Sequence, residues 1–268
     1  MKTSIKLVIS DLDGTLLGSD HQLSLETINT LQALHKTGIQ FWIATGRHHQ
    51  DALVIRNQIG FPIRMITANG ATVSDLNGDL EHAYSLNKDV AQAILRLEIP
   101  IGVYANAYQG DAWLTEVPDK VFEDYYHPEG FRYTLCKFSE RWETPLNKIF
   151  FTSLDHQQLL PLAKHIEMHF SDFVDTTFSM PQCLEIMPKG TNKGSAIHNL
   201  LQREGIAVQE VLAYGDGMND LEMLTLVGHG HLLANANPKL IAALPNLPII
   251  GHHHEHAVAK SLQSYFQL

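Results

Sequence analysis

The stretch "KLVISDLDGTLLGSD", from Lys6 to Asp20, decides the fold of this chain. Residues 5–10 form an almost continuous apolar run, which predicts a central parallel strand covered on both faces. The run ends at two aspartates one residue apart, Asp11 and Asp13. Residues i and i+2 of an extended segment point the same way, so both carboxylates are expected to face one cavity. Two like charges this close raise one pKa unless a cation lies between them, so the pair indicates a cation site.

Strand and helix patterns alternate after this first strand. Leucine and isoleucine recur every three residues from Leu25 to Leu34, between a helix N-cap at Ser24 and a closing Gly38. A second apolar strand follows in residues 39–44, a helix reaches about residue 58, and a third strand follows in residues 64–71. This order predicts an α/β fold with right-handed crossovers and a doubly wound parallel sheet.

The pattern changes in the middle of the chain. Asn77-Gly78 is a strong hairpin signal, and from about residue 85 strands come in antiparallel-looking pairs with helices between them. The α/β alternation resumes after Pro188. We therefore predict a core domain formed by residues 1–84 and 186–268, with an inserted α+β domain of residues 85–185.

Composition excludes several classes of function. The chain has 268 residues, 44% of them hydrophobic, and a formal net charge of −10, which argues against a nucleic-acid-binding surface. The sequence has no apolar stretch near the ~20 residues of a membrane span and no signal peptide, so we expect a cytoplasmic protein that does not bind membranes. Cys136 and Cys183 are too few for a disulfide framework.

Polar residues follow several of the expected strands at their carboxyl ends, where open α/β sheets bind ligands. Besides the aspartate pair, the sequence places there the segments Thr45–Arg47 and "GDGMND" (215–220), with Lys193 at a nearby helix start. Carboxylates suit Mg²⁺, which binds through a few carboxylates and substrate phosphate. The Thr45 hydroxyl, backbone N–H groups near Gly46 and the Lys193 ammonium are candidate donors to phosphoryl oxygens.

Two other interpretations of the aspartate pair are possible. A calcium-binding EF-hand loop beginning at Asp11 requires glycine at its sixth position and glutamate at its twelfth. The chain has Leu16 and Gln22 there, and a strand rather than a helix precedes the loop. The pair could also simply begin a turn, but that does not explain why the other polar segments follow neighbouring strands.

The four segments "DLDGTLL", "ATGR", "NKG" and "GDGMNDLEML", in this order, resemble the four motifs of the haloacid dehalogenase (HAD) superfamily. The resemblance covers essentially the whole chain and implies a Rossmann-like core. Thr45 lies 34 positions after Asp11, which leaves room only for a strand–helix–strand unit, so the insertion lies between Thr45 and Lys193. It resembles the type IIB cap of the Cof-type branch, a domain that determines substrate specificity.

The resemblance implies a role for each motif residue. Asp11 would be the nucleophile that forms an aspartyl-phosphate, and Asp13 would be the general acid and base. Thr45 and Lys193 would bind the phosphoryl oxygens and stabilise charge in the transition state. The residues that would hold Mg²⁺ are Asp11, Asp13 through its backbone carbonyl, Asp216 and, through water or Lys193, Asp220.

Some assignments stay open in the sequence. Lys189 is a rival to Lys193, although only Lys193 lies in the "NKG" context of the motif. Asn69 could face the substrate or form a turn, Asn219 could lie near the phosphate or cap a helix, and Arg47 could bind substrate phosphate or anchor its loop. In the insertion, the residues that could contact a leaving group or simply pack in a core are Tyr104, Asn106, Trp113 and Tyr126.

The expected function is a Mg²⁺-dependent phosphatase acting on a small phosphorylated metabolite. The resemblance implies HMP pyrophosphate, a sugar phosphate or pyridoxal phosphate as substrates, and the chain is expected to be a monomer or small homo-oligomer. A phosphomutase and a non-catalytic phosphate-binding protein are the alternatives; the latter needs no nucleophile and acid together.

A histidine-rich segment, His252–His256, invites a metal-binding interpretation. It lacks the HExxH spacing, and adjacent histidines on a loop are expected to point in different directions. The sequence therefore favours a solvated loop before the last helix.

Overall fold

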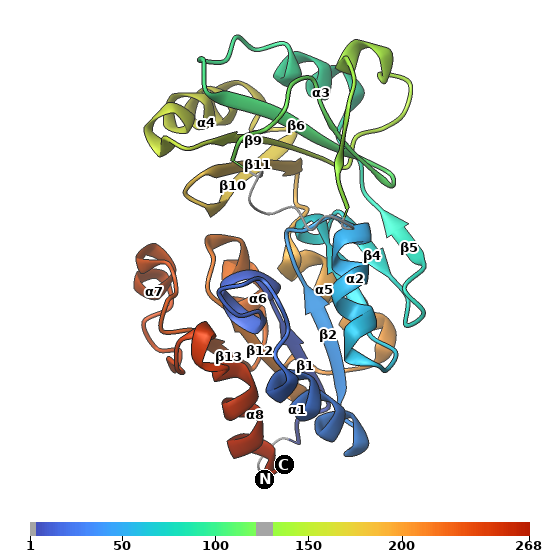
Figure 1. Cartoon of the computed structure of the whole chain (residues 1–268), viewed down its shortest axis with the longest axis vertical. Coiled ribbons are helices and arrows are strands. Elements are labelled where there is room, and N and C mark those ends of the chain that lie inside the picture. Colours follow the sequence, from blue (N-terminus) through green and yellow to red (C-terminus); the bar gives the residue numbers. More distant parts are fainter. Residues whose placement is uncertain (1–3, 122–130) are drawn as a thin grey trace. The chain divides into compact units, whose positions relative to one another are not determined.

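The structure is a computed structural model that describes residues 4–121 and 131–268. The chain divides into two compact units. The first contains the residues up to Arg47, Ala52–His82 and Asn192–Leu268, and the second contains His48–Asp51 and Ala83–Thr191. Figure 1 traces the chain through both of them.

A seven-stranded sheet, in the order β13-β12-β1-β2-β3-β4-β5, forms the centre of the first unit (Figure 1). Its strands are β1 (Leu7–Ser10), β2 (Gln40–Ala44), β3 (Arg64–Thr67), β4 (Thr72–Ser74), β5 (Leu80–Ala83), β12 (Val211–Gly215) and β13 (His229–Leu232). The pairs from β13 to β3 are all parallel, and β3 pairs with β4 antiparallel. The predicted parallel doubly wound sheet is confirmed.

Each central strand packs apolar side chains on both faces of the sheet. Val8 of β1 belongs to the core cluster that includes residues of α1 (Leu25–Lys36), α2 (His49–Ile59) and α8 (Ala257–Phe266). Its neighbours Leu7 and Ile9 belong to the opposite cluster, with α5 (Lys193–Glu204), α6 (Leu221–Leu226) and α7 (Pro238–Ala243). This two-sided burial explains why the sequence of β1 is continuously apolar rather than alternating.

Local signals fix the ends of α1 as the sequence predicts. The Ser24 side chain accepts a hydrogen bond from the Thr27 N–H, which satisfies one of the free donors of the first turn. Gly38, two residues past the end of the helix, has a φ of +85°, a conformation that glycine adopts without strain. The helix length is therefore encoded at both of its ends.

The second unit contains a six-stranded, largely antiparallel sheet in the order β10-β11-β9-β6-β7-β8. Its elements are α3 (Lys88–Leu95), β6 (Val103–Gln109), β7 (Ala112–Thr115), β8 (Tyr133–Leu135), β9 (Lys148–Ser153), α4 (His156–Phe170), β10 (Val174–Met180) and β11 (Cys183–Pro188). The mixture of sheet and helices agrees with the α+β pattern of the middle of the sequence.

The two faces of this second sheet differ in chemistry. Ile149 and Phe151 of β9 pack in one apolar cluster with residues of α3 and α4. The alternate residues of the same strand include Lys148, which forms a buried ion pair with Glu185, and Thr152, which donates a hydrogen bond of 2.5 Å to Asp119. One face is thus an ordinary core, and the other carries buried polar groups.

Both cysteines are free thiols. Among the residues that the structure describes, no helix is long and apolar enough to cross a membrane.

A substitution at Gly194 tests how closely α5 packs against α6. A Cβ at this position would lie 2.7 Å from the backbone carbon of Glu222, closer than real contacts allow. Alanine in an open helix is normally favoured over glycine, but we expect Gly194→Ala to lower the free energy of unfolding by about 1–3 kcal/mol because the helices must separate. Urea unfolding measures the effect. The exposed Asn199→Ala in the same helix is the control, and equal stability of the two variants would contradict this packing.

Candidate active site

The candidate site lies at the carboxyl ends of neighbouring parallel strands of the first unit. Asp11 follows β1, Thr45 follows β2 and Asp216 follows β12, while Lys193 is the first residue of α5. From β1 the chain proceeds to β2 and β3 on one side, and β12 and β13 lie on the other side. Such a point of divergence leaves a crevice outside the strand ends, where α/β folds bind ligands.

A fully buried lysine links the site together. Lys193 Nζ lies 2.9 Å from Asp11 Oδ1 and 2.6 Å from Asp220 Oδ1. Burial lowers the pKa of Lys193, but the two carboxylates outweigh it and hold the pKa well above its usual value. The lysine is therefore positively charged at neutral pH, which keeps a fixed cation beside the Asp11 carboxylate.

Asp220 orders the loop that follows β12. Its Oδ2 accepts hydrogen bonds from the backbone N–H groups of Asp216 and Gly217, at 2.9 and 3.0 Å. Gly215 makes this close approach possible, because a Cβ there would lie 2.6 Å from the carboxyl carbon of Asp220. Asp220 thus positions both Lys193 and the backbone that carries Asp216.

Asp216 receives hydrogen bonds from two sides. The Thr15 hydroxyl donates to its Oδ1 at 2.7 Å, and the Asn235 side chain donates to its Oδ2 at 3.3 Å. Asn235 also donates to the carbonyl of Gly14 at 2.8 Å. Gly14 has a φ of +71°, and a Cβ there would lie 2.3 Å from Asp216, so only glycine fits between the two strand ends.

The carboxylates of Asp11, Asp216 and Asp220 gather within 4.8 Å of one another. Burial, opposed in part by Lys193, raises the pKa of Asp11, and burial together with Asp220 raises the pKa of Asp216 to about 7. The buried Asp11 Oδ1 lies beside Lys193 but forms no hydrogen bond. One lysine leaves two negative charges unbalanced when the three carboxylates ionise. The donor set therefore fits a divalent cation with a preference for oxygen ligands.

Asp13 lies outside this group of three carboxylates and faces Arg47. The Arg47 Nε and Nη2 atoms donate to its two oxygens, each at 2.6 Å, and His21 Nδ1 lies 3.0 Å from Oδ1. Burial raises the pKa of Asp13, but Arg47 and His21 together hold the pKa far below its usual value. Arg47 therefore contacts a carboxylate, and Asp13 is ionised in this arrangement.

The remaining residues with expected roles surround the same strand ends. The buried Thr45 accepts a hydrogen bond from the Arg47 N–H through its hydroxyl, so Gly46 lies within a tight turn. Asn69 has a φ of +53° and donates its backbone N–H to the carbonyl of Thr45. Its side chain accepts a hydrogen bond from Asn219 at 3.0 Å, which joins the loops after β3 and β12.

The structure separates the two rival lysines. Lys189 is exposed and forms an ion pair with Asp175 at 2.7 Å, within the second unit. Of these two lysines, Lys193 is the one that contacts the acidic cluster, the group formed by Asp11, Asp216 and Asp220.

The aromatic and amide candidates of the insertion pack inside the second unit. Asn106 is fully buried, accepts a hydrogen bond from the Trp113 ring N–H at 2.8 Å and donates to Asp119 at 2.7 Å. Tyr104 on β6 is half-buried, and Tyr126 lies outside the described residues. For Asn106 and Trp113 these contacts favour the packing interpretation over contact with a leaving group.

Sequence reasoning missed three residues that touch the site: Thr15, His21 and Asn235. Asn235 follows the last parallel strand, β13, so its position at a carboxyl strand end was the available signal. Nothing local marks His21, because its contact with Asp13 depends on the path of the chain between β1 and α1.

Comparison with known families places the chain among the haloacid dehalogenase-like hydrolases, whose family model matches residues 8–262. The chain belongs to this family. It is 37% identical over 264 residues to the HMP-PP phosphatase of Serratia proteamaculans, covering 98% of this chain and 96% of the relative. It is 36% identical to the HMP-PP phosphatase of Escherichia coli, covering 96% and 94% of the two chains.

Solved structures agree with this membership. A haloacid dehalogenase-like hydrolase from Bacillus subtilis superposes with a TM-score of 0.86 at 28% identity, covering 97% of this chain and 99% of that one. A sugar phosphatase of HAD subclass IIB superposes with a TM-score of 0.80 at 20% identity over 98% of this chain and all of that one, which supports the fold alone. The protein is an enzyme of the phosphatase class.

The raised pKa values predict how stability depends on pH. When the folded state holds a carboxyl proton that the unfolded chain has released, the free energy of unfolding falls as pH rises. The pKa of Asp216 is about 7 when folded, so we expect the melting temperature in EDTA to fall between about pH 4 and pH 7 by this contribution. Bound Mg²⁺ favours the ionised carboxylates, so the fall should be smaller in excess Mg²⁺. Identical curves in EDTA and Mg²⁺ would contradict a cation at the acidic cluster.

The Arg47–Asp13 pair predicts a shift in the pH profile of phosphate release. Arg47→Ala removes the guanidinium while the burial of Asp13 remains, so we expect the pKa of Asp13 to rise by at least about one unit. The acidic limb of kcat, which reports the group that acts as a base in the bound enzyme, should move to higher pH accordingly. Arg47→Lys, which keeps one positive charge without the paired donors, should shift the limb less. An unchanged limb in both variants would show that Arg47 does not control Asp13.

Proposed function

We propose that the protein is a Mg²⁺-dependent phosphatase that hydrolyses a small phosphorylated metabolite through an aspartyl-phosphate on Asp11. The observation that carries the proposal is the buried carboxylate of Asp11, which lies beside the fixed cation of Lys193 and within 4.8 Å of the carboxylates of Asp216 and Asp220. A site built only to bind phosphate would gain nothing from placing buried negative charge against its ligand.

The first step is transfer of the phosphoryl group to the protein. A carboxylate oxygen of Asp11 attacks phosphorus, and the bond to the leaving oxygen breaks. Asp13, once protonated, gives its proton to that oxygen. The Lys193 ammonium and the Thr45 hydroxyl, which lie at the same edge of the sheet as Asp11, would stabilise charge on the phosphoryl oxygens.

The second step is hydrolysis of the aspartyl-phosphate. Asp13, now ionised, removes a proton from water, and the resulting hydroxide attacks phosphorus. The bond between phosphorus and the Asp11 oxygen breaks, so inorganic phosphate leaves and the Asp11 carboxylate is restored. The pairing of Asp13 with Arg47 matches this base form, because the guanidinium stabilises the ionised carboxylate.

Asp11, Asp216 and the backbone carbonyl of Asp13 would hold Mg²⁺. Asp220 would position this group indirectly, through its contacts with Lys193 and with the loop that carries Asp216. When bound, Mg²⁺ supplies a Lewis acid that polarises the phosphoryl group. Thr15 and Asn235 would orient Asp216 for this role by their hydrogen bonds to its two oxygens. Such outer contacts fix the direction of ligand lone pairs.

We further propose that HMP pyrophosphate is the substrate, because two relatives that cover nearly the whole chain are HMP-PP phosphatases. The inserted domain of residues 85–185 would select it as a type IIB cap. Sugar phosphates and pyridoxal phosphate are the competing substrates. Location in the cytoplasm and a monomeric or small homo-oligomeric state stay predictions from the sequence.

The decisive experiment is the hydrolysis of an aryl phosphate by wild type and by Asp11→Asn, with Mg²⁺ or EDTA. We expect Asp11→Asn to lower kcat more than about a thousand-fold, because an amide cannot replace the carboxylate as the nucleophile that accepts the phosphoryl group. The exposed Asp20→Asn is the matched control and should keep wild-type activity. Turnover in EDTA, or full activity of Asp11→Asn, would overturn the mechanism.

Product analysis with the three candidate substrates addresses specificity. Inorganic phosphate should appear with HMP pyrophosphate at the highest kcat/KM. An isomerised sugar phosphate without phosphate release would instead identify a phosphomutase.

A further inference from the structure

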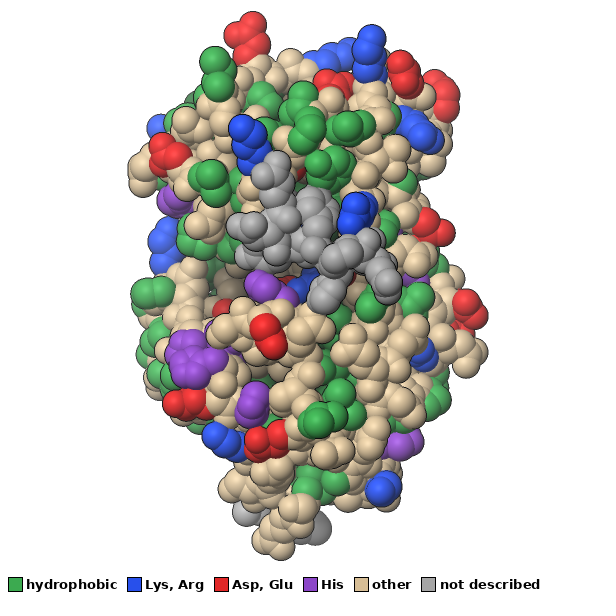
Figure 2. Space-filling view, in the orientation of Figure 1, with side chains coloured by type: hydrophobic (Ala, Val, Ile, Leu, Met, Phe, Trp, Pro, Cys, Tyr) green, Lys and Arg blue, Asp and Glu red, His purple; other side chains and the backbone are tan. Residues whose placement is uncertain are grey.

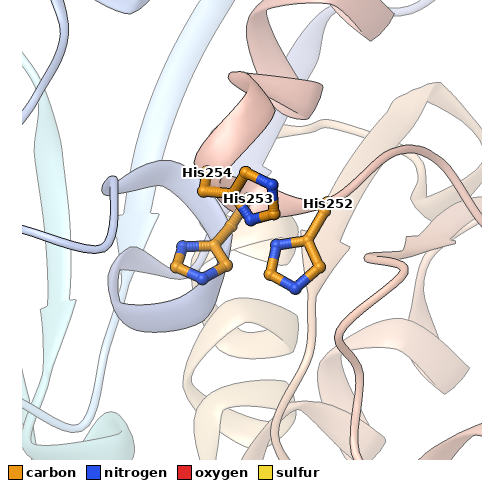
Figure 3. A group of neighbouring side chains, drawn as sticks. All are labelled: His252, His253 and His254. Atoms are coloured by element: carbon orange, nitrogen blue, oxygen red, sulfur yellow. The ribbon is translucent and has the colours of Figure 1, made fainter.

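Three consecutive imidazoles gather at one place on the first unit. His252, His253 and His254 each bring one ring nitrogen to within 4.8 Å of the others. Figure 3 shows the three rings beside one another just before α8, and Figure 2 shows histidine side chains gathered on part of the visible surface. The expectation that these histidines point in different directions is therefore wrong.

The backbone explains the convergence. Residues His253–Glu255 form a single tight 3-10 turn rather than an extended loop, and the next residue, His256, has a φ of +57°. The rings of His252 and His254, on either side of His253, lie with centroids 4.0 Å apart. An extended segment would send neighbouring side chains to opposite sides, whereas the turn folds them onto one side.

A hydrogen bond selects the free nitrogen of the central ring. His253 Nδ1 lies 2.9 Å from the backbone carbonyl oxygen of Leu17. Because a carbonyl can only accept, Nδ1 carries a proton, and in the neutral ring Nε2 then has the free lone pair. Metal-binding histidines are commonly oriented in this way, with one nitrogen donating to a carbonyl and the other facing the metal.

The first ring contains a buried nitrogen without a partner. His252 Nδ1 is shielded from solvent and has no hydrogen-bond partner among the described residues. An unmatched buried nitrogen costs free energy unless a ligand contacts it.

We propose that His252, His253 and His254 form a binding site for a divalent transition-metal ion, with Zn²⁺ as the best match. Imidazole nitrogens favour Zn²⁺ and its neighbours, whereas Mg²⁺ favours oxygen ligands. The chain would therefore bind Zn²⁺ at the histidine site and Mg²⁺ at the acidic cluster. Zn–N bonds of about 2.0–2.1 Å require the three nitrogens to move closer, which the half-exposed His254 side chain permits.

The site would act structurally on its surroundings. The His253 N–H donates to Asn235 Oδ1 at 3.1 Å, and Asn235 in turn donates to the Gly14 carbonyl. Together with the bond to Leu17, these contacts tie the histidine turn to the segment that follows β1. An ion held by the three rings would rigidify this connection, so its main effect should be on stability.

A second histidine pair is the natural rival. His165 and His169 lie one turn apart on α4, and their rings stack with centroids 4.3 Å apart. This pair offers only two rings, and His169 Nδ1 faces the carbonyl of His165. It should bind a metal ion more weakly than three converging rings.

Zinc binding to the untagged full chain tests the proposal. Calorimetric titration with Zn²⁺ in excess Mg²⁺ should give one strong site per chain. We expect His254→Ala to weaken this site at least about tenfold, and His165→Ala to leave it unchanged. Loss of the strong site in His165→Ala but not in His254→Ala would overturn the proposal.

Melting temperature and Co²⁺ absorption are two independent measures of metal binding at the histidine site. Zn²⁺ should raise the melting temperature of wild type but not of His254→Ala or of the milder His254→Gln, whose folding circular dichroism can check. Co²⁺ should give visible absorption typical of nitrogen ligands, and Asp216→Asn should leave that absorption in place. Its disappearance in Asp216→Asn, or the absence of any strong zinc site in wild type, would overturn the proposal.

Discussion

The buried ion pair of Lys193 with Asp11 and Asp220 is the interaction on which the rest of the site depends. It connects the beginning of α5 with the ends of β1 and β12, segments that are about two hundred residues apart in the sequence. A buried charge is stable only when it is closely paired, and removing one partner leaves the others uncompensated. The same contact that stabilises the fold therefore places a cation beside the nucleophile.

The electrostatics of this site favour the binding of a cation. Asp11 and Asp216 have raised pKa values, while Asp13, a short distance along the chain, is held ionised by Arg47. Neighbouring carboxylates with opposite shifts can take different chemical roles. Here the difference in pKa follows from the cations nearby. Arg47 donates two hydrogen bonds to Asp13, whereas Lys193 is shared between Asp11 and Asp220.

The sequence predicted the fold well because its signals were local. Continuous apolar strands, the Ser24 cap and Gly38 each depend on neighbouring residues, and the site motifs follow strands whose carboxyl ends must meet at one sheet edge. Contacts that depend on the three-dimensional path of the chain could not be predicted from the sequence. Asn235 reaches Asp216 because β13 lies beside β12, and His252–His254 converge because of a tight turn that their own residue types do not predict.

The inserted unit has a consequence for synthesis on the ribosome. One apolar face of the first sheet, which includes Leu7, Ile9 and Trp42, is covered by α5, α6 and α7, and these helices all follow the insertion. At about 5–20 residues per second, the ribosome needs roughly 5–20 s to make the intervening segment. For that interval the nascent sheet lacks its cover on this face. The emerging chain therefore exposes this apolar face until its last quarter is made.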